Sequence, residues 1–174
     1  MNQLCRLNTI PLAISLLLLA VNGCGSPSGP PKPSPAGYKT VTFPNGPVQF
    51  SVPESYSESS EPDDTVVITP GEDANITLRF NLHVLPGDLA EEFLKSQAEE
   101  KGLKLTPIGD KTTFSEGGTH SEGGRDYEMK FWQIAFGDSL VIMSAEMDKK
   151  HKGDQVVKDC LSEASKIIES MQKY

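Results

Sequence analysis

The sequence predicts an α+β domain in which two helices sandwich an antiparallel sheet of about six to eight strands. Three observations predict it. Short runs of alternating apolar and polar residues, typical of strands with one buried face, fill much of residues 38–147. Helical spacing of apolar residues is found in two segments, 89–101 and 154–172. The resulting order is four strands, a helix, four strands and a helix, and short turns between consecutive strands indicate antiparallel pairing rather than a βαβ fold.

The first half of the domain contains four predicted strands. An Asn-Gly turn at Asn45 and Gly46, bracketed by prolines, predicts a hairpin of residues 38–43 and 48–52. The acidic segment 53–64 is expected to be a loop. The third and fourth strands are 65–69 and 76–84, and the latter alternates without error, so one of its faces is expected in the core and the other in water or only lightly covered.

The first helix is predicted over residues 89–101, where Asp88 and Glu91 have the spacing of a capping box. Short strands are expected at 103–106 and 111–114. Four glycines in the segment 117–124 predict a flexible loop.

A central hairpin and a C-terminal helix complete the domain. Residues 126–136 and 140–147 are joined by Gly137-Asp138, the order that a type II′ turn prefers. Apolar residues change parity within 126–136, which predicts either a β-bulge or cover on both faces. The helix over 154–172 has a sustained apolar stripe that includes Cys160, which we interpret as a core cysteine.

The N-terminus has the pattern of an export signal. Arg6 precedes an apolar run of about 11 residues, too short for a membrane span of about 20. The run ends in Val21-Asn22-Gly23-Cys24, which resembles the lipobox of bacterial lipoproteins. The resemblance implies a signal peptide over residues 1–23, cleavage after Gly23 and acylation of Cys24.

Lipidation at Cys24 would make the protein a membrane-anchored lipoprotein, because two or three acyl chains anchor a protein stably. Residues 24–37 are rich in Pro, Gly and Ser and are interpreted as a spacer of extended polyproline II character. In families that sort lipoproteins, Asp at the position of Gly25 retains the protein on the inner membrane. Gly25 therefore leaves an outer-membrane location open, with the domain 38–174 on the extracytoplasmic side.

The order of elements between Phe43 and Met171 resembles the PsbP-like superfamily, which includes Mog-type proteins and envelope proteins of the DcrB kind. The resemblance includes the opening hairpin TFPNGPVQFSVPESY and the strand GDSLVIMSAEM before the last helix. It implies a small binding or assembly module without enzymatic activity. No site residue can be transferred, because neither stretch is a catalytic signature.

The composition narrows the function classes. Lys and Arg number 16 against 24 for Asp and Glu, a net charge of −8, which argues against a nucleic-acid partner. No phosphate loop, nucleophile elbow, dinucleotide glycines or paired cysteines occur, so we expect no cofactor and no metal. The three histidines, His83, His120 and His151, fall on separate elements.

The sequence favours a protein-binding module in the cell envelope. Arg79, Arg125 and Trp132 are the candidate contact residues, because Arg and Trp are enriched at interface hot spots. Two alternatives stay open. One is an enzyme with an unrecognised site near 117–124, where His120 and Glu122 would act. The other is a carrier of a small lipophilic ligand, which requires an apolar cavity between sheet and helix.

Overall fold

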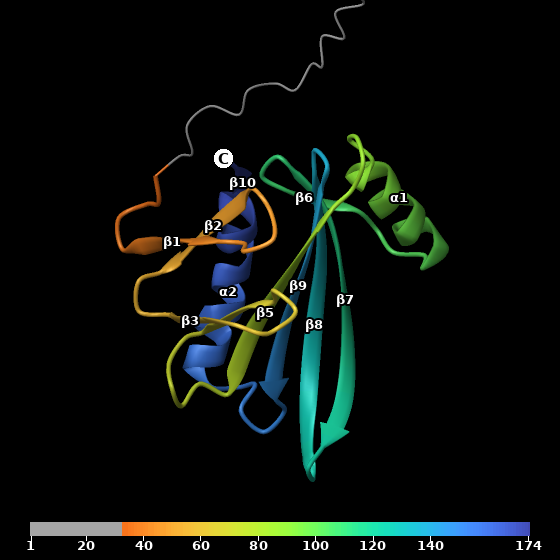
Figure 1. Cartoon of the computed structure of the whole chain (residues 1–174). Coiled ribbons are helices and arrows are strands. Elements are labelled where there is room, and N and C mark those ends of the chain that lie inside the picture. The colour runs from red at the N-terminus through yellow and green to blue at the C-terminus, as the bar shows by residue number, and fades with distance from the viewer. Residues whose placement is uncertain (1–32) are drawn as a thin grey trace, which may run out of the picture.

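A computed structural model describes residues 33–174. The signal peptide 1–23, Cys24 and most of the predicted spacer lie outside the described residues. The domain is α+β, as predicted, with two helices and two antiparallel sheets (Figure 1).

The larger sheet has seven strands in the order β3-β4-β5-β9-β8-β7-β6. Every neighbouring pair in it is antiparallel. In chain order, its strands are β3 Ser57–Ser60, β4 Val66–Thr69, β5 Ile76–Val84, β6 Thr106–Ile108, β7 Lys111–Glu122, β8 Arg125–Phe136 and β9 Ser139–Asp148. The smaller sheet has the order β1-β2-β10 and consists of β1 Tyr38–Thr42, β2 Val48–Pro53 and β10 Gln172–Lys173.

The two helices cover opposite faces of the larger sheet. Ile134 is buried in the main core, which includes α2 (Gln155–Ser170) and the inner faces of β1 and β2. Ala135, the next residue of β8, is buried in a second cluster with α1 (Ala90–Glu100). Because successive strand residues point to opposite faces, α1 and α2 lie on different sides of the sheet.

This arrangement explains the change of parity in 126–136. The pairing of β8 with β9 runs from Tyr127 opposite Asp148 to Phe136 opposite Ser139 without an extra residue, so no bulge interrupts it. Trp132 and Ile134 face the main core, whereas Ala135 faces α1. The β-bulge is therefore excluded. Both faces of β8 are covered around Ile134 and Ala135, whereas Tyr127, Met129 and Phe131 lie on the α1 side of the sheet beyond α1 and are only partly buried.

Several predicted boundaries were wrong. The acidic segment 53–64 contains the strand β3, and the strand expected at 103–106 begins at Thr106. Helix α1 begins after Leu89, and no side-chain hydrogen bond caps it, so the capping box of Asp88 and Glu91 does not form. Asp154 is the N-cap residue of α2, but its carboxylate lies 2.9 Å from Nδ1 of His151 and makes no cap hydrogen bond.

The largest error concerns residues 117–124, predicted to be a flexible loop. Strand β7 continues to Glu122, and only Gly123 and Gly124 form the turn to β8. Eleven successive residues of β7 have a partner on β8, from Thr112 opposite Ala135 to Glu122 opposite Arg125. Continuous pairing with β8 outweighs the low strand propensity of glycine here.

Candidate functional site

One face of the seven-stranded sheet is covered by α1 at one end only. The buried contacts of α1 are with Phe114, Ala135 and Leu140, which lie at the end of β7, β8 and β9 near the Gly137-Asp138 turn. Beyond them, side chains of four strands remain partly exposed on this face. We call this set the open face; it comprises Arg79, His120, Tyr127, Met129, Phe131, Ile142, Ser144 and Glu146.

The strand register places these residues side by side. Arg79 on β5 is opposite Ser144 on β9, and Ser144 is opposite Phe131 on β8. In the next row, Glu146 of β9 is opposite Met129 of β8. The open face is therefore built from segments more than 60 positions apart in the sequence, brought together by the pairing of β5 with β9.

Glu146 lies at the centre of a charged network on the open face. Its Oε1 is 3.6 Å from Nη1 of Arg79, and its Oε2 is 3.8 Å from Nε2 of His120. Arg79 also donates a hydrogen bond from Nε to Oε1 of Glu61, at 3.2 Å. The side chains of Arg79, Glu146 and His120 are 34%, 27% and 35% exposed, so the network is open to solvent and to a partner.

His120 stacks on Tyr127, with ring centroids 4.9 Å apart and planes inclined by 13°. Its Nδ1 is buried and has no hydrogen-bond partner among the described residues. The structure thus pairs His120 with Glu146 and Tyr127 rather than with Glu122, the partner suggested by the sequence. Glu122 is exposed at the end of β7, beside the turn.

Arg125 flanks the same network from the other side. It lines a small polar hollow of about 160 Å³ together with Thr77, Tyr127, Glu146 and Asp148. Two of the three contact residues suggested by the sequence, Arg79 and Arg125, therefore border Glu146.

Trp132 does not share this surface. It is 5% exposed and faces the main core, on the side of the sheet opposite the open face. Nζ of Lys130 lies 4.7 Å from the Trp132 ring centroid, a cation–π contact at the edge of the core. Packing accounts for Trp132, so we do not include it in the contact surface.

Sequence reasoning missed Glu146, Tyr127, Met129 and Phe131 as members of the site. A signal for the last three was present, since they alternate with Glu128 and Lys130 along one strand. That alternation shows that the three residues share one face of the strand, but it does not show whether a helix covers that face. Whether they are covered depends on the position of α1, which the alternation does not give.

An apolar groove runs along α1, from the segment that precedes the helix to the border of the open face. One hollow of about 490 Å³ is lined by Leu85, Pro86, Leu89, Glu92, Phe93 and Ser96. A second, of about 260 Å³, shares Leu85 and Phe93 and adds His83, Gln97, Gln133, Leu140 and Ile142. Leu89 and Phe93 are 49% and 42% exposed, which is high for large apolar side chains.

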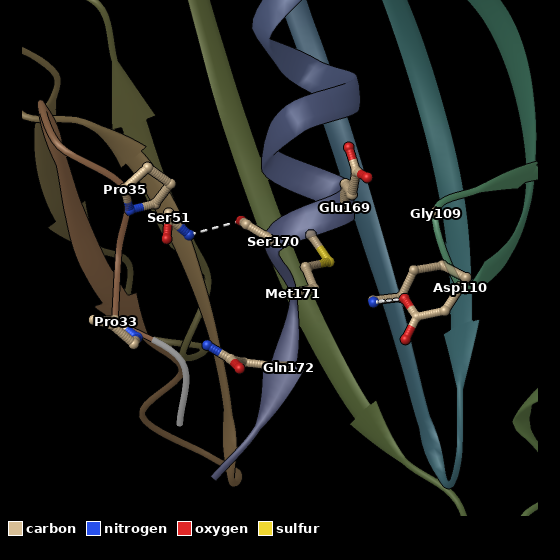
Figure 2. Close-up of a pocket in the computed structure, with 10 residues that line it drawn as sticks. Pro33, Pro35, Ser51, Gly109, Asp110, Glu169, Ser170, Met171 and Gln172 are labelled. Atoms are coloured by element: carbon tan, nitrogen blue, oxygen red, sulfur yellow. Dashed lines mark hydrogen bonds and ion pairs between the residues drawn. The ribbon is translucent and has the colours of Figure 1, made fainter. Parts of the chain in front are cut away.

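A further hollow of about 480 Å³ lies where the N-terminal segment joins the domain (Figure 2). Pro33 and Pro35 lie beside β2 on one side of it, and Gly109 and Asp110 lie on the other (Figure 2). Its polar groups interact with one another: Lys111 is paired with Asp110, and the backbone N–H of Ser51 donates to Oγ of Ser170 at 2.8 Å. We interpret this hollow as part of the junction with the N-terminal segment.

A second contact of the N-terminal segment involves ionisable groups. The hydroxyl of Tyr38 donates to Oε2 of Glu163 at 2.7 Å, and Nζ of Lys166 donates to Oε1 at 2.7 Å. Burial alone would raise the pKa of Glu163, but these two hydrogen bonds outweigh it and lower the pKa. The same bond to Glu163 raises the pKa of Tyr38. The carboxylate of Glu163 thus ties β1 to α2.

Two absences apply to the part of the chain that the structure describes. No helix within residues 33–174 is long and apolar enough to cross a membrane. No group of three or more His, Cys, Asp or Glu side chains among these residues is arranged to hold a metal ion.

Comparison with known proteins supports the fold. No protein-family model matches the chain, and no curated protein matches its sequence. A crystal structure from Bacteroides thetaiotaomicron VPI-5482 superposes with a TM-score of 0.66 at 14% identity, covering 79% of this chain and 49% of that one. The present chain thus spans about half the length of that protein, and the likeness shows the fold alone.

Two other solved structures are more distantly similar. The cyanobacterial PsbP protein CyanoP from Synechocystis sp. PCC 6803 has a TM-score of 0.37 at 12% identity, over 81% of this chain and 95% of that one. LpqN of Mycobacterium tuberculosis, described as involved in cell envelope biogenesis, has a TM-score of 0.47 at 14% identity, over 78% and 90%. At these scores neither structure carries an argument about function.

Proposed function

We propose that the chain is a bacterial envelope lipoprotein, anchored through acyl chains on Cys24, whose domain binds a protein partner through the open face. The observation that carries the binding proposal is the composition of that face. Arg, Met and aromatic side chains are the residue types enriched at protein interfaces, and Arg79, Tyr127, Met129 and Phe131 gather there on a rigid sheet.

The geometry of the open face suits a protein better than a small molecule. The polar hollow beside Arg125 measures only about 160 Å³, below the usual range for small-molecule sites, about 300 to 1,000 Å³. Arg79 and Glu146 sit on a broad strand surface and are about one-third exposed, as residues at the rim of a protein contact are.

Site-specific cross-linking tests the binding proposal. A photo-reactive amino acid at Ser144, in the middle of the open face, is expected to cross-link one stoichiometric partner in the native envelope. The same amino acid at Lys158, exposed on α2, is the matched control and is expected to give no such product. Arg79→Ala should abolish the Ser144 product and Lys158→Ala should leave it unchanged. Equal products from Ser144 and Lys158 would contradict the proposal.

The anchor is tested separately. Cys24→Ala is expected to move the protein from the membrane fraction to the soluble fraction while the domain still folds. Far-ultraviolet circular dichroism of the released protein provides the folding control. A Cys24→Ala protein that remains in the membrane fraction would overturn the anchor, with no bearing on the open face.

The apolar groove beside α1 supports a second candidate function, a carrier of a small lipophilic ligand. Its larger hollow of about 490 Å³ has the size of a ligand site and lies between α1 and the segment that precedes it, and the adjoining hollow of about 260 Å³ lies between α1 and the sheet. Titration with a fluorescent fatty acid tests it: binding is expected to be lost in Phe93→Asp and retained in Lys95→Asp, a charge change on the same helix. Binding that is equal in both variants would exclude the groove.

A further inference from the structure

Strand β7 has a long free edge. On one side it pairs with β8 from Thr112 to Glu122, but on the other β6 reaches only Lys111, Thr112 and Thr113. Among the described residues, no strand is paired with 114–122 on that side, and Figure 1 shows this part of β7 at the border of the sheet. Natural edge strands are usually short or protected by Lys, Pro or a bulge, and residues 115–121 contain no Lys or Pro.

The turn at the end of β7 determines which backbone groups point outward. Gly123 and Gly124 have φ of +57° and +77°, as in a two-residue type I′ turn. In such a hairpin the closing pair, Glu122 and Arg125, is hydrogen-bonded, and hydrogen-bonded pairs alternate along the ladder. The N–H and C=O groups that point away from β8 therefore belong to Ser115, Gly117, Thr119 and Ser121.

The sequence of this edge is complementary to itself about Gly118. Antiparallel pairing of two copies centred on Gly118 places Gly117 opposite Thr119 and Ser115 opposite Ser121, so all the outward backbone groups find partners. Glu116 of each copy then lies opposite His120 of the other. These are non-hydrogen-bonded positions, where Cα atoms are about 4.5 Å apart and side chains lie close together. Within one copy Glu116 accepts a hydrogen bond from Lys101 at 2.6 Å, so the pairing would add His120 of the other copy to this ion pair, twice in the dimer.

Gly118 itself removes the steric obstacle at the symmetry axis. It has no side chain, and a Cβ atom built there meets no atom within 4 Å. We infer that the chain forms a symmetric dimer in which β7 pairs antiparallel with β7 of a second copy, centred on Gly118. This surface is the edge of the sheet and goes beyond the partner proposed for the open face.

Disulfide trapping tests both the dimer and its register. The full chain is prepared with Cys5 and Cys24 replaced by Ser, so that buried Cys160 is the remaining native thiol. In this background Gly118→Cys is expected to form a covalent dimer under mild oxidation, because the two Cα atoms lie within disulfide range. Thr119→Cys is the matched control and should form no covalent dimer, because each Thr119 faces Gly117 of the other copy.

A backbone variant tests the hydrogen bonds. Thr119→Pro removes an N–H that points outward and leaves the pairing with β8 intact, whereas Thr119→Val keeps that N–H. Sedimentation velocity of the full chain over a concentration series is expected to show a monomer–dimer equilibrium that Thr119→Pro abolishes and Thr119→Val preserves. Circular dichroism confirms that both variants fold.

Three results would overturn the inference. One is a chain that stays monomeric at every concentration; the free edge of β7 would then be a site for an extended segment of a different protein. Another is a cross-link in Thr119→Cys but not in Gly118→Cys. The third is a dimer that Thr119→Pro does not weaken. Cross-linking from Ser144 reports on the open face, so either proposal can fail alone.

Discussion

Helix α1 is held by a small cluster, and Leu94→Ala is expected to release it. The buried residues of α1 are Ala90, Leu94 and Ala98, so Leu94 is its one large buried side chain among these. Truncation to alanine loses about 2.4 kcal/mol of transfer free energy, at about 0.8 kcal/mol per carbon group. The neighbouring alanines, including Ala135, have no side-chain length with which to fill the space. The remaining cavity therefore raises the cost to about 3 kcal/mol.

This loss is expected to appear in α1 before it appears in the rest of the domain. The cluster around Leu94 is separate from the main core that contains Trp132, so α1 can open while the core stays folded. Hydrogen exchange measures the opening: α1 amides should lose about 100-fold protection, since about 1.4 kcal/mol corresponds to a factor of ten. Unfolding in urea, followed by Trp132 fluorescence, should shift by less.

Phe93→Ala is the matched control, because Phe93 is the next residue of α1 but is 42% exposed in the groove. It is expected to cost less than about 1 kcal/mol. Equal loss of α1 protection in Phe93→Ala and Leu94→Ala would show that Leu94 does not hold α1. A shift of the Trp132 transition by the full amount in Leu94→Ala would show that α1 does not open separately from the core.

Three further predictions concern the core and the turns. Burial raises the pKa of the Cys160 thiol to about 11, so peptide mapping after iodoacetamide treatment at pH 8 should find Cys160 alkylated in denaturant and unmodified in the native protein. The hydrogen bond from Lys173 lowers the pKa of Asp138, so this pair stabilises the fold at neutral pH and its contribution is lost as the pH falls below about 4; Asp138→Asn should cost about 0.5 kcal/mol at pH 7 and nothing at pH 2, measured by thermal unfolding. Gly46→Ala should cost about 1 to 2 kcal/mol in urea unfolding, because the added Cβ would lie 2.6 Å from Cδ2 of Leu82.

Local sequence patterns predicted the elements more reliably than their arrangement. The alternation in 76–84 predicted β5 with its bounds, and the helical stripe through Cys160 predicted α2, because both patterns reflect a single buried face. The loop expected at 117–124 was wrong because the propensity of glycine is a local property, whereas β7 is held by its partner β8. Secondary structure set by pairing cannot be read from one strand alone.

The contacts within the candidate site were harder to predict from the sequence than the secondary structure. Arg79 occupies a polar position in the alternating pattern of its strand, so the sequence placed it on the solvent-facing side. Its ion-pair partner Glu146 could not be identified in this way, because it is 67 positions away in the sequence. Their contact depends on the pairing of β5 with β9, which are separated in the chain by α1, β6, β7 and β8. Trp132 shows the opposite error. Its residue type suggested an interface contact, but its position in the alternation of β8 directs its side chain toward α2 and the main core.

The two proposed surfaces can be occupied at the same time. Residues 33–35 join the domain beside the small sheet and the end of α2, whereas the turn between β7 and β8 lies at the opposite end of the sheet (Figure 1). The free edge of β7 and the open face are therefore not covered by the described part of the N-terminal segment. Pairing of β7 across a twofold axis would join the open faces of two copies into one continuous surface, with a Glu146 network on each side of Gly118. Antiparallel pairing places the two N-terminal junctions at opposite ends of the dimer, so anchoring both copies at Cys24 requires the twofold axis to stand along the membrane normal. In that orientation, confinement to one membrane raises the effective concentration of the second copy without any new contact.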